Sequence, residues 1–225
     1  MFYDPRWMLL MLVSVALGAL TQGYINSTFK KWSHVPLDSG LTGAEVAERI
    51  LGANGVRGVS IAHVRGQLSD HYDPRSKTLA LSDPVFGASS VAAAGVAAHE
   101  VGHAIQDERR YVWGSVRTAL VPVVNLGSSA AGILIVLGFI IGMSGLLWLG
   151  ILAYSTAVLF QLVTLPVELD ASRRAIRSLE QVGALPAHQL PGARQVLTAA
   201  ALTYVAAALI SILNLLYYVG LANRD

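Results

Sequence analysis

Three stretches of the chain carry no charged side chain and are longer than most helices of soluble proteins. They cover residues 7–29, 118–167 and 195–223. About 20 apolar residues in a helix cross the roughly 30 Å hydrocarbon core of a bilayer. The first and last stretches therefore each predict one membrane-spanning helix, which we place at about residues 7–27 and 198–220.

The middle stretch is about twice as long as one spanning helix requires. It contains the 50 uncharged residues between Arg117 and Glu168. Near its midpoint, residues 142–145 read G-M-S-G, and two glycines favour a turn. We therefore expect a helical hairpin with spans at about residues 120–141 and 146–166. The fold class predicted is a mainly α integral membrane protein with about four transmembrane helices.

The polar segments, residues 30–117 and 167–195, are expected outside the membrane. In the first of them, Thr42 and Glu45 have the spacing of a capping box, in which each residue satisfies a backbone N–H of the other. This pair predicts the start of a short helix, which we place at residues 46–53.

A small β-structure is expected after this helix. Residues 59–64 alternate weakly between apolar and polar side chains, which is typical of a strand. Residues 73–76 read D-P-R-S and predict a turn between strands at 68–72 and 78–82. The polar segment is therefore predicted to be a small α+β portion with a β-hairpin or sheet. Such a strand could bind an extended peptide or could only brace the next helix.

The composition agrees with a membrane protein and narrows the choice of partners. The chain of 225 residues is 54% hydrophobic and 13% charged, with a mean hydropathy of +0.54; this predicts the lipid bilayer as a partner. Its net charge of +2 is small and its basic residues are dispersed, which argues against nucleic acid as a partner. Because the chain has no cysteine, a metal site must use histidine, carboxylate and water.

Basic residues concentrate on one side of the predicted topology. The positive-inside rule places such segments in the cytoplasm, so we expect a multi-pass protein of the cell membrane with both polar segments on the cytoplasmic side. Residues 7–29 could instead be a secretory signal with small residues for cleavage at 16–19, but the run exceeds the usual length. The basic residues concerned are Lys30, Lys31, Arg109, Arg110 and Arg117 before the second span, and Arg173, Arg174, Arg177 and Arg194 between the third and fourth.

The sequence H-E-V-G-H at residues 99–103 is the strongest chemical signal in the chain. Small apolar residues precede it after two serines, which predicts a capped, closely packed helix. Histidines four residues apart face the same way on a helix, so His99 and His103 could bind one zinc ion, with Glu100 placed to act on a water molecule there. The alternative is a buried cluster held by hydrogen bonds without metal, although burial of three polar side chains is costly unless each is paired.

A third protein ligand is needed for a catalytic zinc site. Glu168 follows the third predicted span, and an even number of crossings returns it to the side that carries His99 and His103. Asp170 is the competing candidate, but it points about 160° away from Glu168 on an ideal helix. We therefore favour Glu168 as the third ligand.

Other polar residues near the motif have less certain assignments. Asp107 lies one turn beyond His103 and could orient a ligand, although a solvated position is the simpler expectation. His71 could donate a hydrogen bond to an oxyanion, but a structural or surface role is favoured over this one. His63, His34 and His188 have no predicted role.

Four segments together resemble the bacterial membrane zinc metallopeptidases of the YugP type, in the same order and over nearly the whole chain. The resemblance implies a multi-pass membrane zinc peptidase. The segments are D-H-Y-D-P-R at 70–75, A-A-H-E-V-G-H-A-I-Q at 97–106, P-V-E-L-D-A-S-R at 166–173 and G-A-R-Q-V-L at 192–197.

A more distant similarity concerns the third ligand. Glu168 and Ala171 after a transmembrane hairpin are similar to the third-ligand motif of the HtpX and CAAX prenyl peptidases. Those families carry aspartate directly after this alanine, whereas this chain has Ser172.

We interpret residues 1–225 as one membrane-embedded metallopeptidase domain of the gluzincin kind. In this hypothesis His99, His103 and Glu168 hold one Zn²⁺ per chain, and Glu100 is the general base for hydrolysis of peptide bonds. The expected partners are a protein or peptide substrate associated with the membrane, and an oligomeric or regulatory membrane partner is compatible with the sequence.

Two alternatives come from other functional classes. The first is a non-catalytic, zinc-stabilised membrane scaffold with four protein ligands, to which Asp170 or His71 would contribute. The second is a transporter, which the sequence disfavours because no predicted span contains an ionisable carboxylate, lysine, arginine or histidine.

Overall fold

The structure is a computed structural model that describes residues 4–223. Its contacts divide the described chain into two compact units. Residues 4–21, 115–166 and 203–223 form one unit, which we call the helical unit. Residues 22–114 and 167–202 form the other, which we call the α+β unit.

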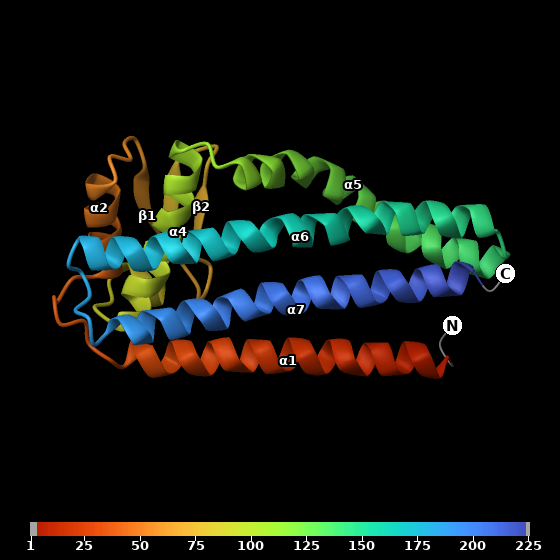
Figure 1. The fold of residues 1–225 in the computed structure, drawn as a ribbon, viewed down its shortest axis with the longest axis horizontal. Coiled ribbons are helices and arrows are strands. Elements are labelled where there is room, and N and C mark those ends of the chain that lie inside the picture. The colour runs from red at the N-terminus through yellow and green to blue at the C-terminus, as the bar shows by residue number, and fades with distance from the viewer. Residues whose placement is uncertain (1–3, 224–225) are drawn as a thin grey trace. The chain divides into compact units, whose positions relative to one another are not determined.

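Four helices in the described chain are long and apolar enough to cross a membrane (Figure 1). They are α1 (Pro5–Ser33), α5 (Val112–Ile141), α6 (Ser144–Gln181) and α7 (Leu190–Ala222). The prediction of four membrane-spanning helices in a mainly α protein is thus confirmed. Each helix is longer than the span predicted for it, because helical structure continues into the polar sequence that flanks the apolar stretch.

The predicted helical hairpin lies in the helical unit. Between α5 and α6, Gly142 has a φ of +71°, a conformation that glycine adopts without steric cost. The two helices pack closely at small residues: a Cβ on Gly138 would lie 2.6 Å from the backbone nitrogen of Leu147, and one on Gly150 would lie 2.8 Å from that of Ile135. The glycines therefore allow backbone-to-backbone contact between the two helices.

The α+β unit contains a three-stranded sheet with the order β1-β3-β2. Strand β1 (Ser60–Val64) pairs parallel with β3 (Thr78–Ser82), and β2 (His71–Asp73) pairs antiparallel with β3. The turn predicted at residues 73–76 lies at residues 74–77 and joins β2 to β3, because Asp73 still belongs to β2.

Strand β2 begins later than the sequence predicts, at residue 71 instead of 68. The preceding loop contains Gly66 and Leu68, both with positive φ, and therefore leaves the extended conformation. Asp70 holds the end of this loop, because its carboxylate accepts hydrogen bonds from the backbone N–H and the hydroxyl of Ser82 at 2.7 and 2.8 Å.

Two helices of this unit have the N-caps that the sequence predicts, although the first of them begins three residues earlier than the predicted range of 46–53. Helix α2 (Gly43–Ala53) begins with the capping box formed by Thr42 and Glu45. Helix α4 (Val91–Glu108) carries the H-E-V-G-H motif, and the side chain of Ser90 accepts a hydrogen bond from the backbone N–H of Ala93 as its N-cap. A single turn of helix, α3 (Asp83–Phe86), lies between β3 and α4.

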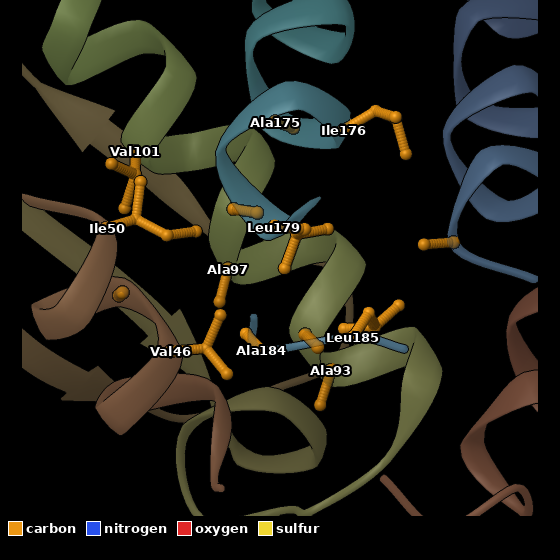
Figure 2. Packing of buried hydrophobic residues seen from close by; sticks show 14 of the residues in the cluster. Val46, Ile50, Ala93, Ala97, Val101, Ala175, Ile176, Leu179, Ala184 and Leu185 are labelled. Carbon is orange, nitrogen blue, oxygen red and sulfur yellow. The ribbon is translucent and has the colours of Figure 1, made fainter. Parts of the chain in front are cut away.

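Helix α4 runs through the hydrophobic core of the α+β unit. Figure 2 shows its side chains between those of α2 and those of α6. Ala97 and Val101 of α4 are fully buried together with Ile50 of α2 and Leu179 of α6. Because the residues of α4 are mostly small, neighbouring helices approach its backbone closely.

The closest approach to α4 occurs inside the H-E-V-G-H motif itself. A Cβ on Gly102 of α4 would lie 2.6 Å from the backbone oxygen of Ala171 on α6. Such a contact is too short for any real side chain, so glycine is required at this position.

We expect Gly102→Ala to separate α4 from α6 and to lower the free energy of unfolding by about 1–3 kcal/mol, the usual cost of overpacking. Gly52→Ala in α2 is the matched control, because a Cβ there would meet nothing within 4 Å. Thermal unfolding of the protein in detergent, followed by tryptophan fluorescence, measures both. Equal melting temperatures for the two variants would contradict the close contact.

Candidate metal centre

Three potential metal ligands from two helices converge in the α+β unit. His99 and His103 lie on successive turns of α4, and Glu168 lies on α6, two residues after Pro166. One ligand atom from each side chain lies within 4.8 Å of the other two. The three residues that the sequence predicts as ligands are therefore brought together.

The two imidazoles point their Nε2 atoms at the same carboxylate oxygen. The Nε2 atom of His99 lies 3.2 Å from Oε2 of Glu168, and that of His103 lies 3.6 Å from it. The rings are nearly perpendicular, at 87°, with centroids 4.8 Å apart. Glu168 is buried and both histidines are half-buried, so the site is largely shielded from bulk water.

The other ring nitrogen of each histidine has a protein partner. Ser172 places its Oγ 3.2 Å from Nδ1 of His99, and Gln106 places its Oε1 3.0 Å from Nδ1 of His103. Ser172 stands at the sequence position where the similar HtpX and CAAX prenyl peptidases carry aspartate. Here its hydroxyl supports the imidazole of His99 directly. Partners of this kind fix the orientation of a metal-binding imidazole.

The contacts of Gln106 determine the tautomer of His103. The amide nitrogen of Gln106 donates hydrogen bonds of 2.8 Å to the backbone oxygen of Val167 and to Oδ2 of Asp170. Both partners are acceptors, so the amide oxygen must face His103, whose Nδ1 then carries the proton. The Nε2 of neutral His103 therefore directs a lone pair toward Glu168.

This arrangement fits a metal ion. A lone pair on Nε2 of His103 and a carboxylate oxygen of Glu168 face each other, and they require a positive charge between them, either a second proton or a metal cation. Burial by itself would lower the pKa of His103, but the hydrogen bond to Glu168 and the charges of Glu100 and Glu168 raise that pKa above its ordinary value. Two imidazole nitrogens and one carboxylate oxygen are a donor set typical of catalytic zinc.

Glu100 lies beside the ligands without being one of the three. It is buried, with 8% of its surface exposed, and belongs to the same turn of α4 as His99. Its carboxylate makes no hydrogen bond or ion pair with any residue that the structure describes. It is therefore free to accept a hydrogen bond from a water molecule or a substrate.

Asp170 is held away from the candidate ligands. Its carboxylate accepts hydrogen bonds from Gln106 and from the guanidinium of Arg174. This agrees with the helical geometry, which separates Asp170 from Glu168 by about half a turn.

Asp107 and His71 also lie outside the group of ligands. The hydroxyl of Tyr72 donates a hydrogen bond of 2.8 Å to Asp107, which ties β2 to α4. Burial and the neighbouring Asp107 raise the pKa of Tyr72 well above its ordinary value, so this hydroxyl stays protonated. The exposed ring of His71 instead places Nδ1 2.9 Å from the backbone oxygen of Ser69.

The remaining histidines pair with surface groups. His63 lies 2.7 Å from a carboxylate oxygen of Asp83, and His188 lies 3.2 Å from one of Asp38. The ring of His34 contacts the backbone oxygen of Lys30 at 2.6 Å.

Sequence reasoning missed two residues of this site, Gln106 and Ser172. Each has a local signal, because Gln106 lies three residues after His103 and Ser172 lies four residues after Glu168, spacings that place both pairs on one helix face. The signal is weak, since the contact of Ser172 with His99 joins residues that are 73 positions apart.

We expect Gln106→Leu to lower zinc affinity by about 10- to 100-fold, because His103 loses the partner that orients it. Competition with a zinc-binding dye measures the change. Gln67→Leu, in an exposed loop, is the control and should leave the affinity unchanged. An unchanged affinity in the Gln106 variant, with the melting temperature preserved, would contradict the orienting role.

Comparison with known proteins adds independent information. A family model described as "Putative neutral zinc metallopeptidase" matches residues 7–223. The chain is also 45% identical over 210 residues to the "Putative membrane protease YugP" of Bacillus subtilis (strain 168), which covers 93% of each chain. No solved structure matches the chain.

Proposed function

The chain belongs to the neutral zinc metallopeptidase family, and from this premise we propose that it is a membrane endopeptidase that hydrolyses peptide bonds of protein substrates. The observation that carries the proposal is the convergence of His99, His103 and Glu168, whose ligand atoms lie within 4.8 Å of one another. These three residues would hold one zinc ion per chain, in the manner of a gluzincin.

The ligand set leaves a coordination position for water and substrate. Zinc at a site with three protein ligands polarises a substrate carbonyl and lowers the pKa of bound water. The surrounding residues prepare the ligands for this role. Ser172 and Gln106 orient the two imidazoles, and Asp170 and Arg174 in turn fix the amide of Gln106.

Glu100 would perform the proton transfers. Its carboxylate accepts a proton from the water that attacks the carbonyl carbon of the peptide. When the C–N bond breaks, the same proton passes to the leaving amine. The lack of a hydrogen bond or ion pair from Glu100 to any described residue supports this role, because the carboxylate is not committed to the fold.

The sheet offers a place for the substrate backbone. Strand β2 is an edge strand, and Tyr72 fixes it beside α4 through Asp107. An extended peptide could add to the free edge of β2 as a further strand, which would bring its scissile bond toward the histidines. The competing role for β2 is only to brace α4, through the same contact.

The position in the membrane is part of the proposal. By the positive-inside rule, the basic residues that flank the spans support a metal centre on the cytoplasmic side of a multi-pass protein. The substrates would then be membrane-associated proteins, and an oligomeric or regulatory partner could control access. That residues 1–225 work as a single domain remains a prediction.

The scaffold alternative has less support. A structural zinc site needs four protein ligands. Asp170 is committed to Gln106 and Arg174, and His71 lies against Ser69. Neither residue is in the candidate metal group of the described chain.

We expect Glu100→Gln to lower casein hydrolysis by about 10²- to 10⁴-fold, because an amide cannot accept the proton from water. Zinc content should stay at that of the unmodified protein, since Glu100 is not one of the proposed ligands. Hydrolysis by detergent-purified protein and elemental analysis measure the two quantities. Full activity in this variant would refute the general-base assignment.

We expect Glu168→Ala to lose both zinc and activity, because two imidazoles alone bind zinc weakly at a site built for three ligands. Glu180→Ala is the matched control: it removes a carboxylate from the same helix at an exposed position. Zinc retained by the Glu168 variant would exclude that residue as a ligand. Retained zinc without hydrolysis in the unmodified protein would favour the scaffold.

A further inference from the structure

A groove lies between the polar ends of α6 and α7 in the α+β unit. Its volume is about 520 Å³. Its charged lining consists of Arg173 and Arg177 from α6 and Arg194 from α7, and its apolar lining includes Leu169, Leu197 and Ala201. We propose that this groove binds the headgroup of one anionic phospholipid.

None of the three arginines is neutralised by a direct ion pair, although the charge of Arg173 also acts on Asp170. All three are exposed, and none forms an ion pair or a hydrogen bond with another residue of the described chain. Arg174, on the same helix, differs because it pairs with Asp170. Guanidinium groups suit a phosphate group, because arginine can donate a pair of hydrogen bonds to its oxygens, and three of them around one groove add a positive charge that attracts it.

The apolar lining of the groove suits an acyl chain instead of a second charge. Leu197 and Ile176 in its wall are buried, and Leu169 and Ala201 continue the apolar surface toward the predicted spans. A free phosphate or an acidic peptide would gain nothing from this surface. The headgroup of a phospholipid would contact the arginines, and its acyl chain would contact the apolar lining.

Arg194 and Arg173 lie close enough to the predicted spans to reach the headgroup layer. Arg194 precedes the predicted span at residue 198 by four residues, or about 6 Å of helix, and Arg173 follows the span that ends at residue 166 by seven residues, or about 10 Å. Arg177 lies one turn further from the span, at about 16 Å, on the outer rim of the groove. The polar layer on each side of a bilayer is several Å thick, and arginine side chains extend toward it. Basic pockets between spanning helices recognise lipid headgroups in this way.

The groove is separate from the proposed metal ligands. Of its lining residues, Ser172 contacts a histidine of the metal centre, and the three arginines do not. The inference therefore stands on binding alone and does not require the protein to be a peptidase.

The test is a lipid titration of the full chain in a neutral detergent, followed by native mass spectrometry. We expect one dioleoylphosphatidylglycerol to bind at least tenfold more tightly than dioleoylphosphatidylcholine. Since an arginine near an anionic lipid contributes roughly fivefold, the combined Arg173→Gln, Arg177→Gln and Arg194→Gln variant should weaken binding by roughly 100-fold. Preferential binding that survives this variant would overturn the proposal.

A control variant separates the groove from the general charge of the protein. Arg57→Gln, Arg65→Gln and Arg75→Gln together remove the same charge from exposed positions elsewhere in the α+β unit, and should change the affinity less than twofold. An equal loss in this control would show diffuse attraction and overturn the proposal.

A second variant tests the groove while keeping its charge. Thr198 lines the groove and is exposed, so Thr198→Trp should fill the apolar part and weaken phosphatidylglycerol binding at least tenfold. Millimolar inorganic phosphate and a hexaglutamate peptide should not displace the lipid. Displacement by either competitor would assign the groove to that ligand class and refute the lipid assignment.

Discussion

The contact between the backbones of α4 and α6 at Gly102 and Ala171 is the constraint on which the candidate metal centre depends. Because glycine leaves no side chain at this point, the two helices lie close enough for His99 and His103 to meet Glu168. The small, fully buried residues of α4 maintain this approach along the core of the α+β unit. Packing and chemistry are therefore specified by the same short segment.

Buried polar groups around the centre are joined into one chain of contacts. Arg174 holds Asp170, Asp170 and the carbonyl of Val167 hold the amide of Gln106, and Gln106 holds His103. Each of these buried groups therefore has a hydrogen-bond partner, as is usual for polar groups removed from water. The exception is Glu100, whose carboxylate has no hydrogen-bond partner among the described residues and lies beside the candidate ligands, as the proposed general base would.

Helix α6 runs from the apolar sequence of the third predicted span into the polar sequence of the α+β unit. It starts in apolar sequence, passes Pro166, and then carries in succession the proposed ligand Glu168, Ser172 beside His99, and the arginines of the proposed lipid site. Arg173 and Arg177 lie five and nine residues after Glu168, about 140° and 180° around an ideal helix, and therefore point away from it. The proposed ligand chemistry and the proposed lipid contact can therefore coexist within ten residues.

The sequence alone determined the features that depend on local periodicity and composition. The uncharged stretches located four long helices, Gly142 marked the hairpin, and the spacing of His99 and His103 placed both on one helix face. Glu168 also followed from the sequence, because an even number of crossings limits which residues can reach the motif. Only the tertiary structure decided that β2 starts at residue 71, that Ser172 and Gln106 support the imidazoles, and that Asp170 lies apart from the ligands. The contacts of Ser172 with His99 and of Gln106 with Asp170 join side chains that are distant in the chain and arise from the packing of α4 against α6, which no local pattern encodes.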